Sequence, residues 1–182
     1  MFGHVDASDW SDIDLNTESG TGPVGVVRIL GDETYDWSGW SVSAAGDVNG
    51  DSYDDFLIGV YGADPAGGDG AGETYLVFGH DGTWSDIDFT GTVPSSTAIR
   101  ILGDDADDSS GFSVSSAGDV NNDGYGDFLI GATGADQADE THAGEAYLVF
   151  GHGGEWSDID LDTGTGPVGV LRILGDLSLI HI

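Results

Sequence analysis

The chain of 182 residues contains no cysteine and no lysine, and its only basic side chains apart from five histidines are three arginines, against 34 acidic residues. Without cysteine it can form no disulfide framework, no thiolate zinc site and no thiol nucleophile. The formal net charge of −31 argues against nucleic-acid binding, because contacts to phosphates need cations. An anionic membrane surface would repel the chain for the same reason.

Long apolar segments are absent too. No run of about 18 apolar residues occurs, so we expect no membrane insertion, and no basic-then-apolar leader follows Met1, so no signal peptide is visible. Hydrophobic residues nevertheless make up 38% of the chain, which provides material for a core and distinguishes the chain from a disordered acidic tail. The 32 glycines favour short strands joined by turns.

The sequence is an internal repeat. Arg28-Ile-Leu-Gly-Asp recurs at Arg100 and again at Arg172, each time 72 residues later. The motifs Phe-Gly-His and Trp-Ser-Asp-Ile-Asp recur in the same order, and self-similarity at a fixed period is typical of repeat architectures. The repeats predict two complete units, residues 2–77 and 78–149, followed by a partial third unit, residues 150–176.

The last six residues break this pattern. In the first two units Leu-Gly-Asp leads into polar, acidic sequence, whereas Asp176 is followed by Leu-Ser-Leu-Ile-His-Ile. This hexapeptide resembles the translation of a transposon-end adapter used in sequencing libraries. We therefore interpret residues 177–182 as an adapter-derived artefact and expect the chain to be a fragment; a natural apolar last strand is the alternative.

Each unit contains four short segments with strand character. Gly-Phe-Ser-Val-Ser-Ser alternates apolar and polar residues, and Asp-Phe-Leu-Ile-Gly is an apolar run too short for a helix. Four antiparallel strands per repeat, separated by glycine-rich loops, are typical of a propeller blade. The sequence therefore predicts an all-β fold of four-stranded antiparallel β-propeller blades. The expected strands are residues 26–30, 39–44, 55–59 and 74–78, then 98–102, 111–116, 127–131 and 146–150.

The most informative segments are Gly-Asp-Val-Asn-Gly-Asp-Ser-Tyr-Asp-Asp and Gly-Asp-Val-Asn-Asn-Asp-Gly-Tyr-Gly-Asp. Each places oxygen-bearing side chains at positions 1, 3, 5 and 9 and a backbone carbonyl at position 7. Such all-oxygen, anionic ligation suits Ca²⁺, which takes six to eight oxygens once water or a bidentate carboxylate is added. We predict one calcium site per complete repeat, two in this chain, with the ligands Asp47, Asn49, Asp51, Tyr53 and Asp55, and Asp119, Asn121, Asp123, Tyr125 and Asp127.

An EF-hand is the obvious competing interpretation of these loops. It requires a bidentate glutamate at position 12, where the chain has Ile58 and Ile130. The loops also lead into apolar strands rather than helices. Simple Asx-type turns are the other alternative, but the pattern occurs twice in register. Ser52 stands where the second loop has Gly124, and because the sharp turn prefers glycine we expect the first site to be weaker.

Together these segments resemble the FG-GAP repeats that form the blades of integrin alpha-subunit propellers and occur in many bacterial surface proteins. The matching pieces are Gly-Phe-Ser-Val, the calcium motif, Asp-Phe-Leu-Ile-Gly and Tyr-Leu-Val-Phe-Gly. The Trp-Ser-Asp-Ile-Asp insertion is closer to the long bacterial versions, and residues 59–61 and 131–133 differ from the Gly-Ala-Pro common in the family. Because such propellers commonly have seven blades, the resemblance implies a fragment of a seven-bladed propeller.

The remaining distinctive residues are predicted to be structural. We expect the three arginines to form ion pairs with nearby aspartates, and the histidines of the Phe-Gly-His motif to serve packing or turns. His142 occurs once, in a polar loop, and we expect it to be solvated. We expect Trp10, Trp84 and Trp156 to cover a blade edge, with a sugar-stacking surface as the alternative. A catalytic site should occur once, whereas these features recur, so we predict no enzyme activity.

The leading functional hypothesis is a calcium-binding propeller segment of a large secreted or cell-surface protein, used for adhesion, ligand binding or scaffolding. Extracellular calcium suits modules with a dissociation constant of about 10⁻⁴–10⁻³ M. Its expected partners are further blades of the same parent chain and an extracellular protein or glycan. The alternative is the accessory propeller of a secreted, polysaccharide-degrading enzyme. A calcium buffer is less favoured, because two sites in 182 residues are sparse.

Overall fold

The computed structural model describes residues 26–65, 68–136, 142–162 and 169–174. Within these ranges the chain forms eleven strands and no helix, so the all-β prediction is confirmed. The strands are β1 (Ile29–Leu30), β2 (Ser41–Gly46), β3 (Asp55–Val60), β4 (Glu73–Val77), β5 (Ile87–Asp88), β6 (Ala98–Leu102), β7 (Ser110–Gly118), β8 (Asp127–Ala132), β9 (Glu145–Val149), β10 (Ile159–Asp160) and β11 (Val170–Leu174).

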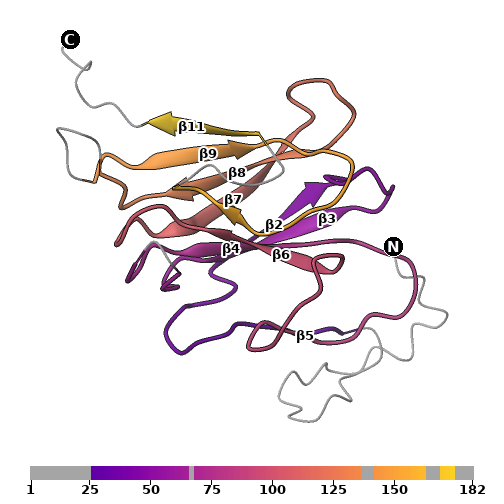
Figure 1. Cartoon of the computed structure of the whole chain (residues 1–182), viewed down its shortest axis with the longest axis horizontal. Helices are drawn as coiled ribbons and strands as arrows, with labels where there is room; N and C mark the ends of the chain where they lie inside the picture. The colour runs from indigo at the N-terminus through magenta and orange to yellow at the C-terminus, as the bar shows by residue number, and fades with distance from the viewer. Residues whose placement is uncertain (1–25, 66–67, 137–141, 163–168, 175–182) are drawn as a thin grey trace, which may run out of the picture.

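Two sheets dominate the fold, each with four antiparallel strands, and the first sheet also carries the short parallel strand β10 at its edge (Figure 1). The first sheet contains β2, β3, β4 and β6, and the second contains β7, β8, β9 and β11, each in that spatial order. Both begin with a hairpin whose first strand carries a bulge, between Ala44 and Gly46 in β2 and between Ser116 and Gly118 in β7. The structure therefore confirms the four-stranded antiparallel unit that the sequence predicts.

Each sheet takes its fourth strand from beyond the end of its own sequence unit. Strand β6 lies in residues 78–149 but pairs with β4, and β11 lies in residues 150–176 but pairs with β9. The expected strand at 26–30 is reduced to β1, which pairs in parallel with β5. The boundaries after residues 77 and 149 therefore separate sequence repeats but not sheets. Each sheet continues across one of these boundaries, because its fourth strand comes from the next repeat.

The Trp-Ser-Asp-Ile-Asp segments contribute two strands that the sequence analysis does not predict. Strand β5 pairs in parallel with β1, and β10 pairs in parallel with β6 at the edge of the first sheet. Two residues of parallel pairing leave no period for a sequence pattern to reveal. Each of these segments thus pairs with an outer strand that precedes it in the chain, β5 with β1 and β10 with β6.

The larger core lies between the two sheets. Leu57, Leu76 and Ile99 project from the first sheet and pack in one buried cluster with Phe128 and Tyr147 of the second. A smaller cluster lies on the opposite face of the first sheet and includes Val60, Tyr75 and Phe89. The alternation of side chains along each strand therefore gives the first sheet two apolar faces, one of which is covered by the second sheet.

Candidate metal centre

The first predicted calcium loop connects β2 to β3 and is organised around Asp47. One carboxylate oxygen of Asp47 accepts hydrogen bonds from the N–H groups of Gly50 (2.7 Å) and Asp51 (3.0 Å), and the other accepts from Ser52 (2.8 Å). Gly50 and Ser52 have positive φ, 78° and 73°. The backbone therefore curls around the first predicted ligand.

Asn49 and Asp51 point into the same turn. Asn49 accepts a hydrogen bond from the N–H of Asp51 (2.9 Å) and donates one from its amide nitrogen to a carboxylate oxygen of Asp51 (3.0 Å). The other oxygen of Asp51 accepts from the N–H of Tyr53 (2.9 Å). Asp51 is exposed to solvent and Asn49 is partly exposed, so their carboxylate and amide oxygens are accessible to a cation.

Asp55, the first residue of β3, lies on the buried side of the loop. Its side chain is buried and accepts hydrogen bonds from the N–H of Val48 and from that of Gly79, both at 2.8 Å. Burial raises the pKa of Asp55 to about 6, against the opposing effect of those two hydrogen bonds, and the charges of Asp51 and Asp47 raise it further. The three carboxylates of this loop therefore repel one another, and a bound divalent cation would relieve that repulsion.

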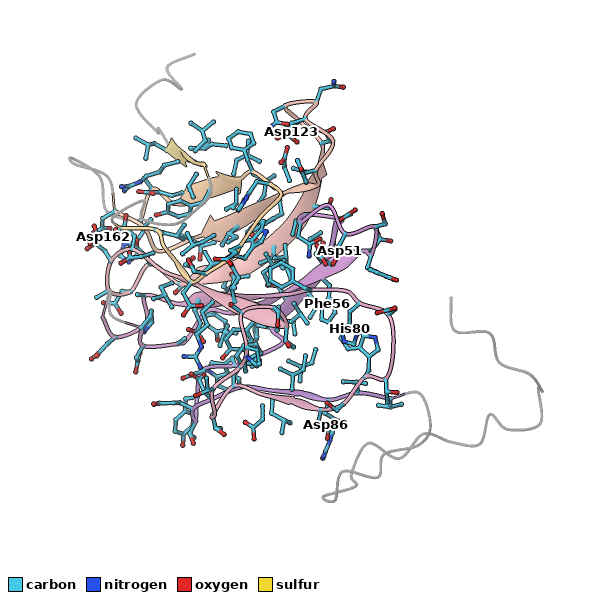
Figure 2. All side chains as sticks on the ribbon, turned by 45° about the vertical axis from the view of Figure 1, so that its right-hand side comes forward. Asp51, Phe56, His80, Asp86, Asp123 and Asp162 are labelled. Atoms are coloured by element: carbon cyan, nitrogen blue, oxygen red, sulfur yellow. The ribbon has the colours of Figure 1, made fainter. Side chains whose placement is uncertain are left out.

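The second loop, between β7 and β8, repeats these contacts. Asp119 accepts from the N–H of Asp123 (3.0 Å) and of Gly124 (2.9 Å). Asp127 is fully buried and accepts from Val120 (2.8 Å) and from Gly151 (2.9 Å). Figure 2 labels Asp51 and Asp123 in the two loops, which lie at the same end of neighbouring sheets.

The donor chemistry of both loops fits calcium. The ten predicted ligands lie in the two loops or at the first residue of the strand that follows each loop, and every donor is an oxygen, as a hard cation requires. Among the described residues, no group of three His, Cys, Asp or Glu side chains is arranged so that it could hold a metal ion. The side chains of Asn49 and Asp51 instead hydrogen-bond to each other. Calcium binding at these ten residues thus stays a prediction.

The Phe-Gly motif has a role that the sequence analysis does not identify. The N–H groups of Gly79 and Gly151 bond to the buried aspartates at position 9. A Cβ built on Gly79 would lie 2.4 Å from the carbonyl oxygen of Asp54, and one on Gly151 would lie 2.3 Å from that of Gly126. Only glycine permits this close approach. The Phe-Gly motif therefore connects the first loop to the residues just after β4, and the second loop to the residues just after β9.

Ser52 is strained in a way that Gly124 is not, because an L-residue at φ 73° costs about 1–2 kcal/mol. Replacing Ser52 by Gly (S52G) should raise the free energy of unfolding by about 0.5–1 kcal/mol after the entropy cost of glycine is subtracted. The reciprocal G124S substitution should have the opposite sign, and urea denaturation measures both. A loss of stability in S52G would contradict the argument.

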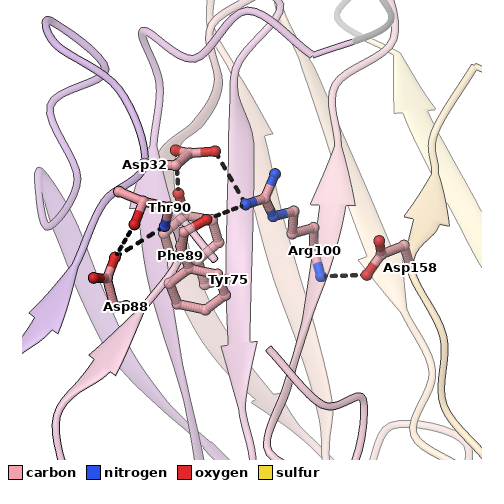
Figure 3. Close-up of polar contacts among 7 residues, drawn as sticks. All are labelled: Asp32, Tyr75, Asp88, Phe89, Thr90, Arg100 and Asp158. Atoms are coloured by element: carbon pink, nitrogen blue, oxygen red, sulfur yellow. Dashed lines mark hydrogen bonds and ion pairs between the residues drawn. The ribbon is translucent and has the colours of Figure 1, made fainter. Parts of the chain in front are cut away.

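The arginines form the expected ion pairs. Arg100 contacts Asp32 at 3.1 Å, and Arg28 contacts Asp86 at 2.6 Å. Arg172 pairs with Asp104 at 3.2 Å and with Glu145. Figure 3 shows the guanidinium of Arg100 in contact with both Asp32 and the carbonyl of Phe89, whose ring stacks on Tyr75. The Arg100–Asp32 and Arg172–Asp104 pairs each link an outer strand, β6 or β11, to the residues that follow β1 or β6.

Glu73 lies near Arg100 without a complete set of hydrogen-bond partners. Its side chain is 3% exposed, and its Oε1 has no hydrogen-bond partner. Burial raises the pKa of Glu73 from its ordinary 4.5 to about 7, the nearby Asp32 adds to this effect, and Tyr75 and Arg100 oppose it. The folded chain therefore binds this proton more tightly than the unfolded chain.

Because the folded pKa of Glu73 lies above the unfolded value, its contribution to stability is present below about pH 4.5 and is lost as the pH rises to about 7. The E73Q variant keeps the shape but removes the titration. We expect the loss of stability between pH 4.5 and 7 to be smaller in E73Q than in the unsubstituted chain by about 2–3 kcal/mol. Urea denaturation at several pH values tests this, and parallel pH profiles would contradict it.

The histidines and tryptophans pack on one another. His80 stacks on Trp84 with ring centroids 4.3 Å apart, and His152 stacks on Trp156 at 4.4 Å. The packing role expected for these histidines is confirmed, whereas His4 and Trp10 lie outside the described residues. Trp156 is only 6% exposed, so its ring offers no sugar-stacking surface. The solvated position expected of His142 is also observed.

Repeated antiparallel sheets of four strands, packed face to face and each carrying an acidic loop between its first two strands, define propeller-type blades. Residues 38–77 and 110–149 match the family described as FG-GAP repeat. The chain therefore contains two FG-GAP repeats, and each match covers β2 to β4 or β7 to β9.

A stretch of 62 residues is 39% identical to the phosphatidylinositol-glycan-specific phospholipase D of Bos taurus. The match covers 34% of this chain and 7% of that protein, so the chain spans a small part of the relative. FG-GAP repeats are typically non-catalytic and occur in extracellular and cell-surface proteins. In the part of the chain that the structure describes, no helix is long and apolar enough to cross a membrane.

Proposed function

We propose that the chain is a calcium-binding segment of a β-propeller in a secreted or cell-surface protein, where it serves adhesion, ligand binding or scaffolding. The observation that carries the proposal is the duplicated loop. In two neighbouring sheets the same five positions of a nine-residue loop present oxygen donors in register, wrapped by the same backbone hydrogen bonds. A repeated arrangement of this kind favours a shared structural role over a single catalytic event.

Calcium would supply the positive charge that each loop lacks. Asp47, Asn49 and Asp51 would hold the ion from the exposed side, with the carbonyl of Tyr53 and the carboxylate of Asp55 completing the protein ligands. Asp55 also accepts the N–H of Gly79, so the ion would be connected to the chain just beyond β4. The corresponding residues would act in the second loop. Calcium would thereby fix the end of each sheet at which the loops meet.

We propose no catalytic role for the chain itself, because its distinctive groups occur two or three times. Extracellular calcium at millimolar concentration suits sites of moderate affinity, which supports a location outside the cell. An extracellular protein or a glycan is the proposed ligand class of the whole propeller.

Further blades are the proposed partners within the parent chain. Ile99 and Ile101 of β6 and Val48 of the first loop are at most 1% exposed and pack in the cluster shared with the second sheet. Their counterparts 72 positions on, Val120, Leu171 and Ile173, are 52%, 52% and 46% exposed. An apolar face that is covered in one repeat and open in the next supports a following blade on the second sheet.

The second candidate function is that of an accessory propeller in a secreted enzyme. The similarity to part of a phospholipase D favours it, although the matched stretch is 7% of that protein. The parent gene separates the two candidates. Additional repeats with anchoring modules favour adhesion or scaffolding, whereas an adjoining catalytic domain favours the accessory role.

The experiment that tests calcium binding uses one variant per loop. Asp51→Ala and Asp123→Ala each remove one exposed carboxylate from a different loop. In equilibrium dialysis at a calcium concentration that saturates the unsubstituted chain, each variant should lose one of two ions and keep the other. Two ions retained by both variants, or none bound by the unsubstituted chain, would contradict the proposal.

A further inference from the structure

The two candidate calcium loops lie against each other through Tyr125. A Cβ built on Gly50 would lie 2.5 Å from Cε1 of Tyr125, so the ring of Tyr125 lies directly over the backbone of Gly50. Gly50 stands between Asn49 and Asp51, two proposed ligands of the first loop. A side chain of the second loop therefore covers the ligand-bearing turn of the first.

One backbone hydrogen bond joins the same two loops, and another joins the first loop to the turn at residues 151–153. The N–H of Gly126 donates to the carbonyl of Asp47 (2.8 Å), and the N–H of His152 donates to the carbonyl of Val48 (2.9 Å). Gly126 lies between Tyr125 and Asp127, which are both proposed ligands of the second loop. The position of Asp47 in the first loop thus depends on the backbone of the second.

Tyr125 is also held from its other side. A Cβ built on Gly153 would lie 2.7 Å from the hydroxyl oxygen of Tyr125, and one built on Gly151 would lie 2.9 Å from its Cβ. The ring therefore fits between Gly50 and the turn at residues 151–153 with little space to move. Because the carbonyl of Tyr125 is the proposed position-7 ligand of the second loop, this one residue belongs to both loops.

We propose that the two calcium sites are coupled through Tyr125, so that occupancy of either loop raises the affinity of the other. This inference rests on the proposed calcium function and concerns its regulation. A cation in the second loop would fix the backbone at Tyr125 and Gly126, and these residues would then restrain Gly50 and Asp47. A second ion would bind to a turn that is already ordered and would lose less conformational entropy. The effect must be reciprocal.

The difference between the two loops at position 4 agrees with this coupling. The first loop has Gly50 at φ 78° beneath the ring, and the second has Asn122 at φ 58° in the same place. Asn122 shows that the loop backbone accepts asparagine there, so the Gly50→Asn variant should leave the turn intact and displace the ring of Tyr125. Tyr53, the counterpart of Tyr125, is 41% exposed and provides the matched control.

The test is a calorimetric calcium titration of the full chain and its variants. The affinity of the first loop is measured with an intact second loop and again with Asp123→Ala. We expect the loss of the second site to weaken the first by about fivefold or more, within the usual range of coupling. The ratio should fall below about twofold when Tyr125→Ala or Gly50→Asn is also present, whereas Tyr125→Phe and Tyr53→Ala should preserve it.

Hydrogen exchange supplies a readout that is independent of affinity at the first loop. In an Asp51→Ala background, where the first site is disabled, calcium should slow exchange at the amide of Gly50, and Tyr125→Ala should abolish the slowing. Equal affinities of the first loop with and without the second site would overturn the coupling and leave the proposed calcium function standing. Failure of the chain to bind calcium at all would overturn both.

Discussion

Removal of calcium is expected to lower the thermal midpoint of the chain by about 10–20 °C. At a calcium concentration of about 100 times the dissociation constant, each site adds about 2.7 kcal/mol. Two sites then add about 5 kcal/mol, and each kilocalorie shifts the midpoint of a chain of this size by about 2–4 °C. The physical cause in the first loop is the repulsion among Asp47, Asp51 and Asp55, and the second loop has Asp119, Asp123 and Asp127 at the same positions.

The measurement is differential scanning calorimetry in calcium and then in excess chelator at constant ionic strength. A variant carrying both Asp51→Ala and Asp123→Ala is the control, because it should melt at the same temperature in either buffer. Magnesium at equal concentration should restore less of the midpoint, since it demands a tighter octahedral geometry. An unchanged midpoint on chelation would contradict a stabilising role for calcium.

Truncation of Phe128 is expected to be the most damaging single substitution in the core. Phe128 is fully buried where the two sheets meet, so Phe128→Ala should lower the free energy of unfolding by about 3–5 kcal/mol. Phe56 occupies the same position in the first sheet, and it is only partly buried, beside Trp84. Phe56→Ala should cost about 1–2 kcal/mol, because less apolar surface leaves water there on folding.

Urea denaturation of the two variants under identical conditions measures the difference. The m-value should be unchanged in both, so that the shift in midpoint reports stability alone. If the two substitutions cost the same, packing of one sheet upon the next would not account for the larger core. A smaller cost for Phe128→Ala would reverse the argument.

Local structure could be predicted from this sequence because its signals are local. The run at Asp127–Ala132 is apolar and too short for a helix, and the alternation within Ser110–Gly118 places Val114 on one face and its neighbours Ser113 and Ser115 on the other. The loop before each such run has its acidic residues at fixed spacing. Strand type, the antiparallel hairpin and the loop that faces solvent all follow from patterns within about 15 residues.

Long-range pairing could not be predicted in the same way. Nothing local to β6 indicates that it completes the first sheet by pairing with β4 across 20 intervening residues. The parallel pairs of β5 and β10 are each two residues long. The contact of Tyr125 with Gly50 joins residues 75 positions apart. The only sign of it in the sequence is that position 4 is Gly50 in the first loop and Asn122 in the second.

The central claim is that each complete repeat holds one calcium ion in its acidic loop, and calorimetric titration of the full chain with calcium tests it most directly. The account predicts two ions per chain, bound with dissociation constants of about 10⁻⁴–10⁻³ M. It also predicts that the loops account for both ions, so the doubly substituted chain with Asp51→Ala and Asp123→Ala should give no binding heat. No uptake of calcium by the unsubstituted chain below about 10 mM, well above that affinity range, would contradict the claim.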